Sequence, residues 1–445
     1  MATTTKRGFM DRLLLRKSVE QVQHETETSE LKRTLGPWGL VFLGIGCIIG
    51  AGIFVRTGNA AALHAGPAVL LSFLVAGIVC GLAGLCYAEL SSTLPVSGSA
   101  YTYSYATIGE FAAWIMGALL LLEYGLAASV VAVGWSGYVV SLLGDYGLVI
   151  PVEFTGPTGH QIMRDGVALL GADGSAMTYA FNLPAFLICA LLAVLLVFGV
   201  SESAKVNNVI VAIKLTVIIA FILIVGWFVI QNYDTLKSNW DPFIPEATGE
   251  KGEFGWSGIL RAASIVFFAY IGFEAVSTAG QEARNPKKDM PFGIIGSLLI
   301  CTILYILVSI VMTLVVNYKM LNVPDPVAAA FFDINTLGDM TSVGTLAAFG
   351  IVCLAVVWLR RTHPDIPRGF YVPLYPVLPI AGIVACFALI FTVETRVLIF
   401  FGWYALGAIV LYFLYGMHNS RLNQGLSALG GPDMPEFKED APDRG

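Results

Sequence analysis

Four glycines lie close together in GIGCIIGAGIF, the stretch from Gly44 to Phe54. The stretch falls in the middle of an apolar segment that is long enough to cross a bilayer. Each glycine costs a helix roughly 0.8–1.0 kcal/mol relative to alanine, so the cluster indicates a helix that unwinds at membrane depth. An unwound helix offers free N–H groups to an anion and free carbonyls to a cation. Close packing of two helices through small residues is the alternative interpretation, and the glycines alone do not decide between the two.

Two charged side chains lie deep inside apolar segments, where such residues are rare and usually functional. Glu123 lies in LLLLEYGLAAS, and it either accepts a cationic ligand group or is satisfied by hydroxyl and backbone donors. Lys214 lies in NVIVAIKLTVIIAFI. Burial favours the uncharged form of a lysine, so Lys214 either takes up and releases a proton or is a structural lysine bonded to carbonyls of a neighbouring helix.

A second break is predicted at Gly272, which lies among aromatic residues and is followed by Glu274. We expect Glu274 to act as a gate or a structural residue rather than to touch a ligand. Glu89 and Arg261 lie nearer the ends of their apolar segments, and we expect their long side chains to reach the membrane interface.

The composition excludes most other classes of protein. Of the 445 residues, 56% are hydrophobic and 13% are charged, against about 25% charged in soluble domains. The chain is therefore predicted to be an all-α polytopic membrane protein. The seven cysteines lie in or beside apolar runs without metal or disulfide spacing, so we expect them to be small core residues. No cofactor, metal or nucleic acid is expected, and no nucleophile–base set or phosphate-binding loop suggests an enzyme.

Ten membrane spans are predicted, at 37–64, 67–93, 110–143, 181–200, 206–230, 257–281, 291–316, 342–360, 376–393 and 397–416. Lysines and arginines concentrate in the segment 1–35 and in alternate loops, which predicts that both termini are cytoplasmic. The breaks lie in spans 1 and 6, as expected for two inverted five-span repeats. The predicted units are a first repeat at 36–230, an incomplete second repeat at 257–360, two further spans at 376–416 and a disordered tail at 417–445.

Five stretches together resemble the amino acid–polyamine–organocation superfamily of permeases, and specifically its cationic amino-acid transporter branch. They are GIGCIIGAGIF (44–54), YAELSSTLPVSGSAY (87–101), SESAKVNNVIVAIK (201–214), FFAYIGFEAVSTAGQEARNPKKDMP (267–291) and TSVGTLAAFGIVCLAVVWLRRTHPD (341–365). The resemblance extends over nearly the whole chain and implies a fold of twelve helices with broken helices 1 and 6.

The resemblance also implies the positions of the substrate-binding residues. The carboxylate of an amino acid is expected at the amides of Gly50, Ala51 and Gly52. Its amine is expected near the carbonyls of Ile48, Ile49, Phe268, Ala269 and Ile271, with the Phe268 ring as an aromatic gate. Glu123 matches the acidic position that faces the side-chain pocket. Lys214 matches a lysine that stands in for a sodium ion and links transport to protons.

The chain departs from the family in the middle of the second repeat. After NVPDPVAAA (322–330), the family continues with its eighth and ninth helices, whereas FFDINTLGDMTSVGTL (331–346) follows here at once. Two helices are therefore expected to be missing, either through a deletion or an incomplete gene model, or because a partner fills the gap.

The residues and the resemblance together imply a secondary active amino-acid transporter in the plasma membrane, coupled to protons and favouring cationic amino acids. A permease for a broad range of neutral amino acids is the alternative within the same class. A truncated membrane protein that binds amino acids without transporting them is the alternative from another class.

Overall fold

The computed structural model of the protein describes residues 13, 15–17, 33–53, 55–156, 158–164, 167–170, 175–197, 204–321 and 334–420. Most of the segment 1–35, most of the tail 417–445 and the junction between Ala330 and Phe331 lie outside these residues. Seven of the described helices are long and apolar enough to cross a membrane, and three shorter ones are also apolar. This confirms the prediction of an all-α polytopic membrane protein.

The described helical segments follow the ten predicted spans. The first broken helix consists of α3 (Pro37–Ile48), η1 (Ala51–Ile53), α4 (Val55–Ala60) and η2 (Ala61–Ala65), and the second of α11 (Gly255–Val266), η6 (Phe267–Tyr270) and η7 (Phe273–Gln281). The others are α5 (Val69–Thr93), α7 (Glu110–Asp145), α8 (Leu183–Val197), α9 (Ala204–Gln231), α12 (Pro286–Val315), α13 (Ile334–Thr362), α14 (Val377–Ile390) and α15 (Thr395–Leu411), the last continued by η9 (Tyr412–Gly416) and α16 (Met417–Asn419). The inverted repeat and its boundaries stay a prediction.

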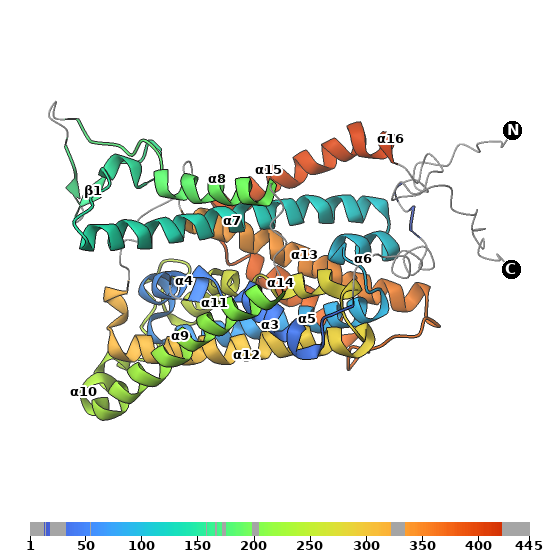
Figure 1. Cartoon of the computed structure of the whole chain (residues 1–445), viewed down its shortest axis with the longest axis horizontal. Helices are drawn as coiled ribbons and strands as arrows, with labels where there is room; N and C mark the ends of the chain where they lie inside the picture. Colours follow the sequence, from blue (N-terminus) through green and yellow to red (C-terminus); the bar gives the residue numbers. More distant parts are fainter. Residues whose placement is uncertain are drawn as a thin grey trace, which may run out of the picture.

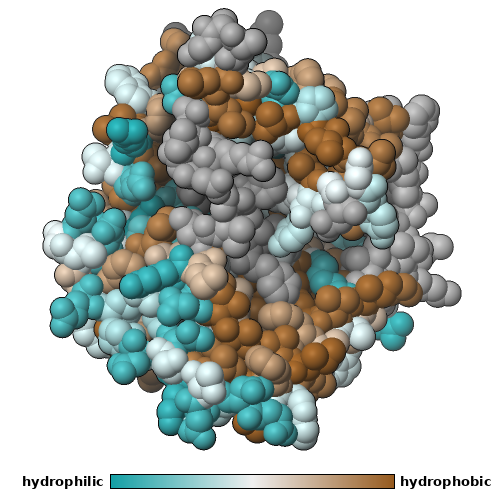
Figure 2. All heavy atoms as spheres, turned by 90° about the vertical axis from the view of Figure 1, so that its left-hand side faces the viewer, coloured by the Kyte–Doolittle hydropathy of each residue, from teal (hydrophilic) through white to brown (hydrophobic). Residues whose placement is uncertain are grey.

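Short elements connect these helices. They are α6 (Ser99–Thr107), α10 (Tyr233–Leu236) and an antiparallel hairpin of β1 (Met163–Arg164) and β2 (Val167–Ala168). α6 and α16 lie at one end of the molecule, whereas β1 and α10 lie at the other (Figure 1). Figure 2 looks onto the end with β1 and α10, where hydrophilic residues gather on one side and hydrophobic residues border them.

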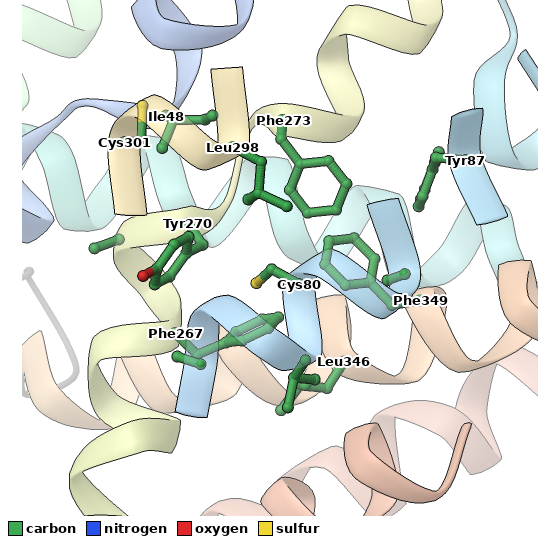
Figure 3. Close-up of a cluster of buried hydrophobic side chains, with 14 of the residues drawn as sticks. Ile48, Cys80, Tyr87, Phe267, Tyr270, Phe273, Leu298, Cys301, Leu346 and Phe349 are labelled. Carbon is green, nitrogen blue, oxygen red and sulfur yellow. The ribbon is translucent and has the colours of Figure 1, made fainter. Parts of the chain in front are cut away.

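The core surrounds the second broken helix. α12 packs against α5 and α3, and α13 packs against α7 and α14. Figure 3 shows aromatic side chains from α5, η6, η7 and α13 in contact in this core. Phe273 lies with its ring 4.9 Å from that of Phe349 and 5.7 Å from that of Tyr87, and Phe267 lies 5.7 Å from Phe349. Tilted and edge-to-face pairs of this kind stabilise beyond their buried area, so they hold the second broken helix in place.

The outer helices carry large exposed apolar side chains. α8 packs mainly on α7, and α9 packs on α12 and α3. On α9, Leu223, Ile224 and Trp227 are each about two-thirds exposed. Apolar faces of this extent suit contact with lipid rather than with water.

Glu89 and Arg261 do not reach the membrane interface, so that prediction is wrong. Glu89 is fully buried and accepts hydrogen bonds from Arg360 Nε at 2.7 Å and from the backbone N–H of Val372 at 2.7 Å. Arg261 donates to Asp339 at 2.5 Å, and the other oxygen of Asp339 accepts from a second arginine, Arg56, at 2.9 Å. Partners on α13 and on the segment after it satisfy these charges inside the protein, and a buried charge with such partners has no need of water.

The cysteines follow the prediction in part. Cys80, Cys86, Cys301, Cys353 and Cys386 are buried, as expected for small core residues. Cys47 and Cys189 are exposed, so the prediction is wrong for these two. Cys189 lies on the peripheral helix α8, and Cys47 lies in the last turn of α3 beside the first helix break.

Candidate functional site

The two helix breaks lie against each other. α3 ends at Ile48, and Ile49 is extended, with φ −74° and ψ 105°. In the second broken helix Ile271 is extended, and Gly272 has a φ of 120°. A Cβ on Gly52 would lie 2.8 Å from Cα of Ala269, and a Cβ on Gly272 would lie 2.7 Å from the backbone of Cys47. The backbones touch at these points, so only glycine fits, and the positive φ at Gly272 adds a second reason.

Tyr305 of α12 joins the two breaks through a single hydroxyl. The hydroxyl lies 3.0 Å from the carbonyl oxygen of Ile48 and 2.7 Å from that of Ala269. These are two of the carbonyls expected near the amine. A hydroxyl has one hydrogen, so it donates to one of these carbonyls at a time. Sequence analysis missed Tyr305; the only signal was a polar group in the middle of an apolar span.

Lys214 of α9 binds the C-terminal end of α3. Its ammonium donates to the carbonyl of Gly46 at 3.0 Å and to that of Ile49 at 2.6 Å. The last carbonyls of a helix have no partner within the helix and carry its negative dipole end, so a cation is favoured there. The contact fits both interpretations of Lys214, as a structural lysine and as a proton carrier.

Glu123 and Glu274 lie next to each other in the core. Glu123 of α7 is fully buried, and neither of its carboxylate oxygens has a hydrogen-bond partner among the described residues. The hydroxyl of Thr345 and the carboxyl of Glu274 lie beside it. Glu274 is 1% exposed, and its Oε2 accepts from the backbone N–H of Gly272 at 2.9 Å. Glu274 thus binds the start of η7. It also lies beside Glu123, the acid that is expected to bind a cationic group of the substrate.

Phe268 is 7% exposed and packs in a small cluster between the second broken helix and α7. Its neighbours there include Val130 and Val133, and its carbonyl accepts from the N–H of Ile271 at 3.3 Å. Of the carbonyls expected near an amine, those of Ile48, Ile49, Phe268 and Ala269 therefore lie near donors of this chain. An amine would replace or share these donors.

One side of the first break is open. A Cβ on Gly50 would meet no atom within 4 Å, Gly50 and Cys47 are both exposed, and Lys214 is only partly buried. An unwound backbone and an ammonium are tolerated at membrane depth only where protein or a water-filled cavity covers them. Among the described residues, this side of the first break is the side that no helix covers.

Comparison with known proteins shows to which family the chain belongs. A family model described as amino acid permease matches residues 35–335. The chain belongs to the amino acid permease family. The methylthioribose transporter of Bacillus subtilis is 37% identical over 492 aligned positions, which cover 93% of this chain and 100% of that protein. The branched-chain amino acid permease BcaP of the same organism is 37% identical, over 92% of this chain and 98% of its own length. The chloroplastic cationic amino acid transporter 9 of Arabidopsis thaliana is 36% identical, over 80% of this chain and 59% of its own length.

The alignment with the first of these relatives is longer than this chain. The alignment with the methylthioribose transporter has 492 positions, which exceeds the 445 residues of the chain. That relative therefore carries residues with no counterpart in this permease. The family match ends at residue 335, close to the junction predicted between Ala330 and Phe331. The alignment length shows that the relative has residues that this chain lacks, and the loss of two helices between Ala330 and Phe331 stays a prediction.

Replacing Gly52 by valine tests whether the crossing of the breaks forms the binding site. The new side chain meets the backbone of Ala269, which must move, and a shift of about 1 Å in a binding group can cost roughly a hundredfold. We expect amino-acid binding to fall by about this factor in a scintillation-proximity assay, with insertion into the membrane unchanged. Gly407→Val is the matched control, since no atom lies within 4 Å of a Cβ there. Unchanged affinity in Gly52→Val would rule out this site.

Proposed function

We propose that this permease is a secondary active transporter of amino acids that is coupled to protons and favours cationic substrates. The observation that carries the proposal is the contact of two unwound helices at membrane depth, beside a fully buried acid, Glu123. The free N–H groups around Gly50, Ala51 and Gly52 suit the carboxylate of an amino acid. The carbonyls of Ile48, Ile49, Phe268, Ala269 and Ile271 suit its amine.

Charge selection is assigned to Glu123. A carboxylate without a hydrogen-bonded partner in the core attracts a cationic side chain strongly, because little solvent screens the interaction. A permease for neutral amino acids is the alternative, and it has support of its own, since one relative at 37% identity is a branched-chain amino acid permease. Phe268 provides an apolar aromatic surface that fits either substrate and is proposed as the gate.

Proton coupling is assigned to Lys214. The charged lysine holds the end of α3 through two carbonyls, and the uncharged amine holds it less well. The two protonation states therefore favour different positions of α3. A proton shifts a conformational equilibrium only if it binds the two conformations with different affinities. Lys214 provides this difference, because its charged and uncharged forms favour different positions of α3. Glu274 is proposed to stabilise the start of η7 as a gate or structural residue.

The open side beside Gly50 and Lys214 is proposed to be covered by protein in the working transporter. The proposed occupant is a pair of membrane helices equivalent to the eighth and ninth helices that the family resemblance implies, supplied by a partner protein. Without this cover the chain binds amino acids but does not transport them, which is the alternative from the other functional class.

Glu123→Gln tests charge selection, because it keeps the shape of the side chain and removes its charge. Two unit charges about 4 Å apart attract by about 1 kcal/mol in water and about 4 kcal/mol near a protein surface. Arginine binding should therefore weaken by roughly five- to a thousandfold, whereas alanine binding should change little. Competition against a labelled amino acid measures both. Glu110→Gln, at the far end of the same helix, is the control. An equal loss for arginine and alanine would make Glu123 a structural residue.

Lys214→Met tests coupling in liposomes with an imposed inward proton gradient, using the chain with the missing helices restored. The unaltered protein should accumulate amino acid above equilibrium without need of sodium. The variant should lose accumulation, because it cannot change its charge, while exchange of bound amino acid continues. Lys237→Met, an exposed lysine outside the membrane spans, is the matched control. Sodium dependence, or full accumulation by Lys214→Met, contradicts the assignment.

The proposed cover is tested by inserting between Ala330 and Phe331 the residues of the Bacillus relative that this chain lacks. Cys47 is exposed in this chain, so we expect it to react with a maleimide more slowly in the chimera. The reaction is followed by mass spectrometry, and complete labelling of both proteins in denaturant is the control. Equal rates in the two folded proteins would show that these helices do not cover the open side.

A further inference from the structure

Two buried carboxyls from different helices meet behind the helix breaks. Glu123 comes from α7 and Glu274 from η7, and their exposed fractions are 0% and 1%. Three of their four oxygens have no hydrogen-bond partner among the described residues. Only Oε2 of Glu274 has one, the backbone N–H of Gly272. Native proteins leave few buried polar atoms without partners, so three in one place call for an explanation.

The surroundings of the pair supply hydroxyls and thiols. The hydroxyl of Thr345 on α13 lies beside Glu123. The other titratable groups that face the pair are Tyr87 and Cys80 of α5, Cys47 of α3 and Tyr124 of α7 itself. Tyr87 stands in the packed aromatic cluster next to Phe273, the residue before Glu274 (Figure 3).

Lys214, a cation that shares the neighbour Cys47 with Glu274, binds other groups. Its ammonium binds Gly46 and Ile49, and its charge acts on the thiols of Cys47 and Cys301. Two adjacent carboxyls in a protein interior cannot both ionise without a counter-charge, because the like charges repel and each has lost its water. One proton shared by the pair removes this conflict, as it does in the paired acids of aspartic proteases.

We propose that Glu123 and Glu274 form a proton-binding site that exchanges its proton for the cationic side chain of a substrate. Without substrate the pair holds one proton and carries one negative charge. When a guanidinium or ammonium group binds, the O–H bond of the protonated carboxyl breaks and the proton passes to solvent. Both carboxylates are then ionised against one positive charge, so the net charge of the site stays at minus one.

The proposal rests on the proposed function and extends it, since it adds a proton site distinct from Lys214. A neutral amino acid has no cation to offer, so it leaves the shared proton in place. Cationic and neutral substrates therefore differ in the number of protons that their binding releases. The site thus sets the proton stoichiometry of transport according to the charge of the substrate.

Isothermal titration calorimetry of the purified full chain tests the exchange directly. Arginine and alanine are titrated at one pH in phosphate and in Tris, two buffers with different heats of ionisation. We expect about one proton released for each arginine bound and close to none for alanine. By linkage, arginine affinity should rise about tenfold for each unit of pH over the range in which the pair holds its proton, while alanine affinity stays flat.

Two variants and one measurement on the unaltered chain complete the test. Glu274→Gln should lower the release well below one proton, because Glu123 then has no neighbouring acid to repel it. Glu110→Gln is the matched control, a buried acid about 20 Å away along α7 that binds Tyr105 and Ser420, and it should keep the release at one. Infrared difference spectra of the unaltered chain should show the loss of a protonated carboxyl band when arginine binds.

The outcomes separate the two proposals. Arginine binding without proton release, or full release in Glu274→Gln, overturns the exchange and leaves amino-acid binding intact. Failure of both arginine and alanine to bind overturns the exchange together with the proposed function. A proton released equally by arginine and alanine also overturns the exchange. The release would then be caused by the head group that both amino acids share and not by the cationic side chain.

Discussion

The contact between two interrupted backbones is the constraint on which the rest of the site depends. Gly52 lies against Ala269 and Gly272 lies against Cys47, and both helices are interrupted at this crossing. Each interruption frees backbone N–H and C=O groups at a depth where water is scarce, and such groups need partners. Polar side chains meet this need at membrane depth. The Tyr305 hydroxyl lies within hydrogen-bond distance of two carbonyls, and Lys214 donates to two more. The Glu274 carboxylate accepts from an amide.

The signs of these charges match the ends of the helices that they bind. Lys214 is a cation at the C-terminal end of α3, and Glu274 is an anion at the N-terminal end of η7. Each arrangement is favoured by the free groups and the dipole at that end. Because each charge holds one half of a broken helix, a change of its protonation alters the hold on that half. The proposed coupling between protons and conformation therefore acts through the two half-helices that Lys214 and Glu274 bind.

The sequence predicted the features that depend on local composition. Apolar runs separated by polar loops fixed the ten spans, and glycines fixed the breaks around Gly50 and Gly272. The sequence could not predict which spans are neighbours. Tyr305 lies 257 residues from Ile48, and Glu89 meets Arg360 across 271 residues. The expectation that Glu89 and Arg261 reach the interface was wrong for this reason, since their partners became visible only once α13 was placed. Lys214 was the exception, because one of its two interpretations was a lysine bonded to carbonyls of a neighbouring helix.

The two proposed proton sites differ in their distance from the open side of the molecule. Lys214 lies at its edge, only partly buried, so its charge state depends on whether lipid, water or protein stands there. Glu123 and Glu274 are enclosed by α3, α5, α7 and α13, all of which this chain has. The proposed cation site therefore lies among helices that the structure describes, whereas the proposed coupling residue Lys214 lies at the open side. The two proposed roles depend on different parts of the molecule, so one can be lost while the other is kept.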